Sequence, residues 1–245
     1  MRATRRAVMG RGLMAGLAAL GVSHRAAAGP VSSIGGAVFP EVVFSGPADV
    51  AALAITVDDG PDPETTPLIM DALEGAGVRG TFMLIGENAR AAPETVAAIA
   101  ARGHEIGHHM DRDEMTAWLD DAALESGIGE TAEFLRRFAP VRFLRPGWGV
   151  PTRRIIDAAA RHDLTVVVGD VAPMDTSAPQ RSFTEQWLRL NAHPGAILTV
   201  HDLGERGRST AAVIGDAARA FLAWGLTPVT LSELVPSASE PPGLR

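Results

Sequence analysis

Seven short apolar runs alternate with stretches of helical periodicity along most of the chain, and this alternation constrains the fold more than any other feature. The apolar runs predict strands at Leu53–Val57, Gly80–Ile85, Glu105–Gly107, Arg142–Leu144, Leu164–Val168, Gly195–Val200 and Thr227–Thr230. The stretches between them predict helices at Thr66–Gly75, Pro93–Arg102, Ala122–Phe138, Thr152–Arg161, Phe183–Leu190 and Thr210–Ala223. This order is typical of parallel strands joined by crossover helices. About seven such strands predict an α/β fold, an incomplete or distorted (β/α) barrel rather than a full eightfold one.

The two ends of the chain differ from this central part. Paired arginines, Arg5 and Arg6, precede a short Gly/Ala-rich apolar run, and Ala26–Ala28 supply small residues for cleavage. This layout predicts a secretory signal of the twin-arginine type, with a Sec signal as the alternative. The predicted organisation is a signal peptide at 1–28, a leader segment at 29–49, one catalytic domain at 50–235 and a flexible tail at 236–245. We therefore expect an exported protein in the periplasm, outside the cell or in the cell wall, without stable membrane insertion once the signal is removed.

Missing residue types narrow the chemistry. The chain has no cysteine, which excludes thiol catalysis and leaves His, Asp and Glu as its strong metal ligands. It also has no lysine, which excludes Schiff-base catalysis. The formal net charge is -7, and loss of the arginine-rich signal makes it more negative, so nucleic acid is not an expected partner. Nothing in the sequence indicates an oligomeric state.

Two adjacent carboxylates, Asp58 and Asp59, follow the first apolar run and precede a Gly60-Pro61 turn. Adjacent residues at a strand end point in different directions, so one Asp can hold a metal while the other acts as a base on the bound water. An isolated Asp-Asp-Gly is more often an ordinary turn. Here further His, Arg and Asp residues follow other predicted strands, and active sites of parallel α/β folds form at those strand ends.

The segment from Gly103 to Asp113 holds three histidines and ends in acidic residues. If the chain becomes helical after Gly107, His109 and Asp113 lie at i and i+4 on one helix face and can bind one ion. The alternative interpretation is that these histidines are polar surface residues without a metal.

Two further strand ends carry candidate groups. Arg145 beside a carboxylate site would lower a carboxylate pKa, and Trp148 offers a flat face for a sugar ring; a structural Arg and a core Trp are the alternatives. His201 closes an apolar run and suits a general acid, although a lone His there is more often a buried structural residue. Either Asp175 or Asp202 would orient it.

The order of these motifs resembles the polysaccharide deacetylases, the NodB-homology or carbohydrate esterase family four, over roughly 53–234. Thr-Val-Asp-Asp-Gly-Pro is similar to the first family motif, with Val57 in place of Phe. The resemblance implies a distorted barrel that holds a divalent metal, with zinc expected and cobalt, nickel or manganese as alternatives. By the same resemblance, Asp58 is the catalytic base, steadied by Arg145, and His201 is the general acid, oriented by Asp175. The implied metal ligands are Asp59, His109 and Asp113. The implied substrate contacts are Pro146, Gly147, Trp148 and Leu198.

Three positions depart from the family pattern. Asp113 stands where the family has a second histidine, Ala172 where many members have an acid, and Thr176 where Trp is common. Two carboxylates and one imidazole would cancel the charge of a dication, which predicts a weaker Lewis acid. We interpret the site as a variant branch of the family.

The function implied by the resemblance is removal of N-acetyl groups from amino sugars of a polysaccharide or oligosaccharide, chitin-like or peptidoglycan, with release of acetate. Two alternatives stay open. The protein could be a secreted glycan-binding protein without turnover, which Asp113 and Ala172 would favour. It could also be an amidase or deformylase acting on a lipid-linked sugar or a small amide.

Overall fold

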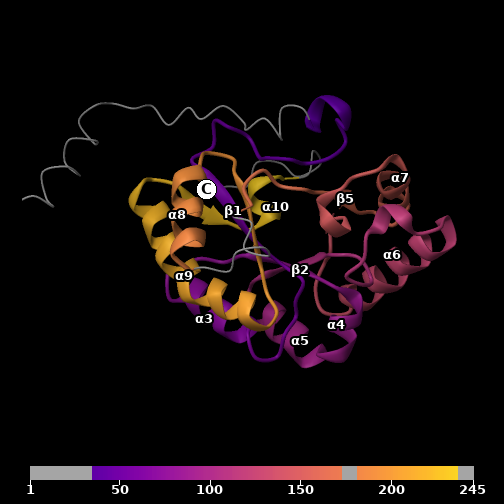
Figure 1. Ribbon diagram of the computed structural model, residues 1–245, viewed down its shortest axis with the longest axis horizontal. Coiled ribbons are helices and arrows are strands. Elements are labelled where there is room, and N and C mark those ends of the chain that lie inside the picture. Colours follow the sequence, from indigo (N-terminus) through magenta and orange to yellow (C-terminus); the bar gives the residue numbers. More distant parts are fainter. Residues whose placement is uncertain (1–34, 173–180, 237–245) are drawn as a thin grey trace, which may run out of the picture.

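The computed structural model describes residues 35–172 and 181–236 (Figure 1). The strands are β1 Ala52–Asp58, β2 Thr81–Leu84, β3 Glu105–His108, β4 Phe143–Leu144, β5 Thr165–Val166, β6 Ile197–His201 and β7 Thr227–Val229. The helices are α3 Thr66–Glu74, α4 Gly86–Ala91, α5 Pro93–Ala101, α6 Asp121–Arg136, α7 Arg153–Arg161, α8 Arg181–Asn191, α9 Gly204–Ala223 and α10 Leu231–Leu234, with 3-10 helices η1 Thr116–Trp118 and η2 Gly147–Gly149. The predicted signal, Asp175, Thr176 and nearly all of the predicted tail lie outside the described residues.

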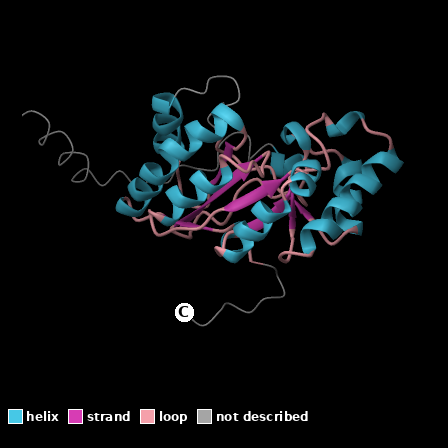
Figure 2. Cartoon of the chain, turned by 90° about the horizontal axis from the view of Figure 1, so that it is seen from below, coloured by secondary structure: helices cyan, strands magenta, loops and turns pink. Residues whose placement is uncertain are grey.

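All strand pairings are parallel, in the order β5-β4-β3-β2-β1-β6, and β7 also pairs with β1. Helices surround the strands (Figure 2), with α3, α8 and α9 together on one side in Figure 1 and α6 and α7 on the other. Every residue of β1 is buried, as expected for a central parallel strand covered on both faces. No helix in the described ranges is long and apolar enough to cross a membrane.

The two edges of the sheet approach each other, so the sheet curls into an incomplete barrel. Beyond β5, Val171 forms a parallel bridge with Leu198 of β6. The Asp170 carboxylate strengthens this closure, because its Oδ1 accepts a hydrogen bond from the Ile197 amide at 2.9 Å. Its Oδ2 lies 3.0 Å from Nε2 of His193, which precedes β6. The prediction of a distorted (β/α) barrel with seven parallel strands is confirmed.

The largest helix of the described part, α9, begins at Gly204, six residues before the predicted start at Thr210. It packs along α3, and a Cβ at Gly215 would lie only 2.7 Å from the Ala72 carbonyl oxygen, so glycine permits this close approach. The short elements α4, α10, η1 and η2 were not predicted, because each is too short to show helical periodicity.

The helix expected after Gly107 does not form. The His109 amide still bonds the Leu84 carbonyl at 2.8 Å, so the sheet ladder continues past β3. At Met110 the backbone then adopts a left-handed φ of 63° with the side chain buried, and a regular helix cannot start there. Arg90 and Thr131 bond the Asp111 carboxylate and tie the following loop to α4 and α6. The i, i+4 argument for His109 and Asp113 was therefore wrong.

Candidate active site

A buried ion pair lies at the carboxyl end of the central strand. Asp58 is the last residue of β1 and is buried. Arg145, directly after β4, donates from Nη1 to Asp58 Oδ1 and to the Thr56 hydroxyl. The Arg145 side chain is only 2% exposed, so both charges are shielded from water. The carboxylate is thereby held in one orientation by a donor that cannot lose its charge.

His109 and Asp59 lie beside this pair. The Nδ1 of His109 is 3.0 Å from the Arg145 carbonyl oxygen, which identifies Nδ1 as the donor nitrogen. Its Nε2 therefore faces the carboxylates, 3.5 Å from Asp59 Oδ1 and 3.9 Å from Asp58 Oδ2. Asp59 reaches this place through a left-handed φ of 75°, which turns it away from the strand direction.

The charges of these groups shift one another's pKa. Burial disfavours a charged imidazole, but the nearby Asp58 and Asp59 carboxylates outweigh burial and raise the pKa of His109. Burial likewise opposes ionisation of Asp59, but the hydrogen bond from His109, with the nearby charges of His201 and Arg206, lowers the Asp59 pKa. Asp59 is thus an anion that attracts positive charge, which is a property of a metal ligand.

Arg206 is a member of the site that the sequence analysis missed. It lies in the first turn of α9, and its Nη1 is 3.1 Å from Asp59 Oδ2. The helix was predicted to start only at Thr210, so Arg206 was assigned to a loop. Its nearness in sequence to His201 was the one available signal.

His201 ends β6 and stands opposite Asp58 in the register of the two parallel strands. The next residue, Asp202, does not act as its orienting acid. The Asp202 carboxylate accepts hydrogen bonds from the hydroxyls of Thr65 and Thr66 and from the Leu203 amide. Burial raises the Asp202 pKa against the effect of these hydrogen bonds. Asp202 therefore ties the end of β6 to the start of α3.

The other two histidines of the second motif have structural surroundings. Burial lowers the pKa of His108 to about 3, and its ring bonds the Ile128 carbonyl and the Met110 amide. His104 accepts a hydrogen bond from the Gly80 amide through Nδ1. Of the three, only His109 faces the carboxylates of Asp58 and Asp59.

The predicted substrate contacts divide into exposed and buried positions. Trp148 is 70% exposed in η2, as a sugar-stacking residue should be, whereas Pro146 and Gly147 beside it are buried. Leu198 is fully buried in β6, beneath the strand end that carries His201.

The implied metal can be tested against the donor set. Asp59 and His109 fit, because the backbone bond at Nδ1 orients the free nitrogen of His109 toward Asp59, the arrangement usual for a ligating histidine. Asp113 does not join them: it is exposed in the loop after His109 and forms no ion pair with another described residue. The described ranges hold no cluster of three or more His, Asp or Glu side chains suited to a metal ion.

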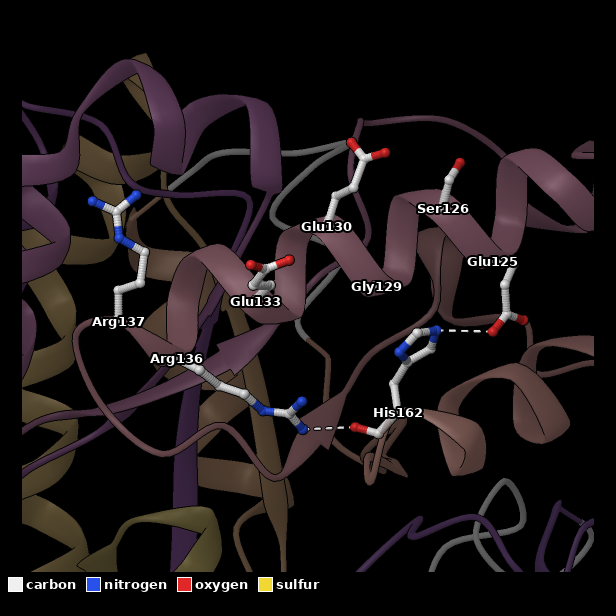
Figure 3. A pocket seen from close by; sticks show the side chains of 8 residues that line it. All are labelled: Glu125, Ser126, Gly129, Glu130, Glu133, Arg136, Arg137 and His162. Carbon is white, nitrogen blue, oxygen red and sulfur yellow. Dashed lines mark hydrogen bonds and ion pairs between the residues drawn. The ribbon is translucent and has the colours of Figure 1, made fainter.

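An open hollow elsewhere on the surface does not belong to this site. It lies along α6 and beside His162 (Figure 3), and Glu125, Glu130 and Glu133 line it. Glu125 pairs with His162 at 2.9 Å and with Arg161. The hollow contains none of the predicted site residues.

Comparison with known proteins identifies the class. The polysaccharide deacetylase family model matches residues 45–167, half of the chain, and the chain belongs to this family. A peptidoglycan-N-acetylglucosamine deacetylase of Bacillus cereus is 34% identical over 161 residues, which cover 64% of this chain and 58% of that relative. A chitooligosaccharide deacetylase of Sinorhizobium fredii is 30% identical over 152 residues, 60% of this chain and 70% of the relative. The predicted family is confirmed, and the curated relatives that match this chain are named as deacetylases.

Solved structures agree with this fold. A peptidoglycan N-acetylglucosamine deacetylase crystallised with a hydroxamate-type benzamide has a TM-score of 0.76 at 30% identity and covers 82% of this chain and 95% of its own. A pseudoenzyme of carbohydrate esterase family four from Bacillus anthracis has a TM-score of 0.73 at 19% identity, over 79% of this chain and 68% of its own. At that identity the likeness concerns the fold alone, so turnover has to be argued from this chain's own residues.

Proposed function

We propose that this protein removes acetyl groups from N-acetylated amino sugars of a bacterial cell-wall or chitin-like glycan. The observation that carries the proposal is the arrangement at the end of β1, where Asp58 is held by Arg145 beside Asp59 and His109. His201 stands across from Asp58 in register, so a base and an acid can reach one amide bond from two neighbouring strands. The matching relatives act on peptidoglycan and on chitooligosaccharides, and both are candidate substrates.

The proposed mechanism uses these side chains in turn. Asp58 Oδ1 is engaged by Arg145, so the other carboxylate oxygen is available to take a proton from the attacking water. The water oxygen adds to the acetamide carbon, and a tetrahedral intermediate forms. His201 then donates a proton to the amide nitrogen as the carbon-nitrogen bond breaks. Acetate and a free amino sugar leave, with Asp175 proposed to orient His201.

A divalent cation held by Asp59 and His109 would polarise the acetamide carbonyl and the water, with zinc as the first candidate. Asp113 would complete the ligand set only after a movement of the exposed loop that carries it. The paired arginines at the N-terminus support export to the periplasm, the cell surface or the cell wall, where both candidate glycans occur.

A second candidate function is glycan binding without turnover. The exposed position of Asp113 favours it, since two protein ligands bind a metal less firmly than three. Conversely, the buried pair of Asp58 and Arg145 favours catalysis, because a binding groove gains nothing from two charges kept out of water.

The test measures acetate release by the full-length protein with zinc, cobalt, nickel or manganese. The substrates are N-acetylglucosamine oligomers, peptidoglycan fragments and a small acetamide. We expect glycan turnover, and Asp58→Asn should reduce kcat by 10²- to 10⁴-fold, roughly the contribution of a general base. Asp216→Asn is the matched control, because Asp216 is an exposed partner of Arg219 on α9.

Three outcomes decide between the candidates. Substantial turnover by Asp58→Asn would remove Asp58 as the base. Tight glycan binding with no acetate from any metal form would establish the binding-protein alternative. Turnover of the small acetamide in preference to glycans would instead indicate an amidase.

A further inference from the structure

Two tryptophans are exposed at the same edge of the sheet. Trp148 is 70% exposed in η2, and Trp118 is 81% exposed in η1. The two 3-10 helices follow neighbouring strands, because η1 lies beyond β3 and η2 directly beyond β4. Parallel strands place both helices at the carboxyl edge, which also carries Asp58 and His201. Trp118 had no assigned role in the sequence analysis.

The two helices are joined to each other by tight contacts. The Gly147 amide donates to the hydroxyl of Thr116 at 3.1 Å, and that threonine is 1% exposed. A Cβ at Gly147 would lie 2.4 Å from the Glu114 carbonyl oxygen, so only glycine allows this approach. Trp118 and Trp148 therefore project from backbone segments in direct contact.

The chain around Trp118 is held on both sides. Before Trp118, the Thr116 hydroxyl accepts the hydrogen bond from the Gly147 amide. After it, Arg154 donates to the Leu119 carbonyl at 2.6 Å and to the Asp121 carboxylate. A large apolar ring that stays in water on an anchored backbone contributes nothing to the core. Tryptophan is enriched at surfaces that bind partners, because its ring combines a large apolar face with a polar N–H group.

The charges around Trp118 limit what that ligand can be. Asp113, Glu114, Asp120 and Asp121 precede or follow it in sequence, and the basic residues beside them are Arg112 and Arg154, which pairs with Asp121. This acidic surrounding disfavours nucleic acid or an anionic lipid surface. A neutral N-acetylated sugar suits this surface better. Its apolar ring face can stack on the indole, and its hydroxyls can donate hydrogen bonds to the surrounding carboxylates.

We infer that Trp118 forms a second sugar-stacking site beyond Trp148, so that the site takes a glycan chain and not a single sugar. This inference rests on the proposed glycan substrate. It predicts that affinity rises with chain length and that the rise depends on Trp118. Sugars too short to reach from the reacting acetamide to Trp118 should not respond to its loss.

The experiment measures glycan affinity by titration calorimetry on full-length Asp58→Asn protein, which separates binding from turnover. The probes are N-acetylglucosamine oligomers of two to six sugars and soluble peptidoglycan fragments of matching length. Adding Trp118→Ala should weaken binding of the longest chains by about tenfold and of the shortest by less than about twofold, the effect of one stacked ring. Trp118→Phe should restore most of the loss.

Trp224→Ala is the matched control. Trp224 is also exposed but follows α9, close to Thr227, where β7 pairs with the amino end of β1, so its loss should not change glycan binding. Thermal unfolding of each variant checks that the exposed substitutions leave the fold intact.

The outcomes separate this inference from the proposed function. Acetate release by the wild-type chain with identical long-chain affinity in Trp118→Ala would overturn the second site and leave the enzyme. Weaker long-chain binding in Trp118→Ala without acetate release would support the second site and remove the enzyme. The second site would also be overturned if the protein bound no glycan at all. It would be overturned as well if Trp118→Ala abolished self-association of the protein without changing its affinity for glycans.

Discussion

Two parts of the candidate site are held in opposite ways. The buried pair, Asp58 and Arg145, lies under the carboxyl ends of the strands with side chains 4% and 2% exposed. The β3–η1 loop, residues 109–115, starts at the buried His109 and then runs outward, so that Asp113 is exposed. One part fixes the proposed base, and the other carries the proposed third metal ligand on an exposed loop.

This difference separates two requirements of the proposed reaction. A base has to be positioned before the substrate arrives, and a buried partner with a fixed charge does this. A metal ligand on a loop can be brought in by the ion itself, because binding energy can order the segment. The buried pair is therefore expected to determine stability, whereas the β3–η1 loop is expected to adjust metal affinity.

The largest expected effect concerns stability. Arg145→Ala leaves the Asp58 carboxylate buried without its partner, and this should lower the free energy of unfolding by about 3–5 kcal/mol. The matched change in the loop is Arg112→Ala. Arg112 is 67% exposed and lies 3.6 Å from Asp111, so its loss should cost about 0–1 kcal/mol. Urea unfolding followed by circular dichroism measures both.

Equal losses of stability in Arg145→Ala and Arg112→Ala would contradict the distinction between the buried pair and the exposed loop. If Arg145→Ala cost less than about 1 kcal/mol, Asp58 would not depend on a buried partner, and water would reach it in the folded protein. An Arg145→Lys variant sharpens the result, since lysine keeps the charge but lacks the guanidinium Nη1 that donates to both Asp58 and Thr56.

The same difference explains which parts of the site could be predicted from sequence. Asp58, Arg145 and His201 each end or follow an apolar strand, and parallel pairing brings such positions to one edge whatever the loops do. Periodicity and strand order therefore placed them correctly. The curled sheet was predicted for the same reason, because it follows from the βα alternation.

The parts that were missed depend on backbone details that periodicity does not encode. The left-handed turn at Met110 precedes the exposed Asp113, and no pattern in the sequence predicts this turn. The early start of α9 brings Arg206 to Asp59. Asp202 looked like a partner for His201, yet the hydroxyls of Thr65 and Thr66, far away in sequence, bind it instead.

Metal affinity should respond to both parts, but unequally. His109→Ala removes a buried ligand candidate and should weaken zinc binding by about 100-fold or more, given that even outer-shell losses cost 10- to 100-fold. Asp113→Ala should cost about tenfold or less, because the loop has to move before its carboxylate can contribute. Competition with a chromophoric chelator measures both, with Asp216→Ala as the surface-carboxylate control.

Either extreme for Asp113 would change the comparison. A loss as large as that of His109→Ala would mean that the β3–η1 loop closes over the ion and becomes as well fixed as the buried pair. No loss at all would remove Asp113 from the ligand set and leave Asp59 and His109 as the protein donors among the described residues.

The smallest expected effect uses a second buried pair, Asp170 and His193, which closes the barrel between β5 and β6. Unlike Arg145, His193 can lose its charge. The Asp170 carboxylate, which can accept a hydrogen bond from the imidazole Nε2, raises the His193 pKa against the effect of burial. The folded pKa is then above that of the unfolded chain, so the pair stabilises the fold fully below about pH 6.5 and progressively less as pH rises through the raised value.

The wild-type protein should therefore be more stable than His193→Gln by on the order of 1 kcal/mol at mildly acidic pH, with the difference shrinking toward pH 9. The stability difference for Arg112→Ala should stay constant over the same range, since arginine does not titrate there. Urea unfolding at several pH values measures both. A His193→Gln difference that does not change between about pH 6 and 9 would show that this imidazole keeps one protonation state over that range, so that the pair would respond to pH no differently from Asp58 and Arg145.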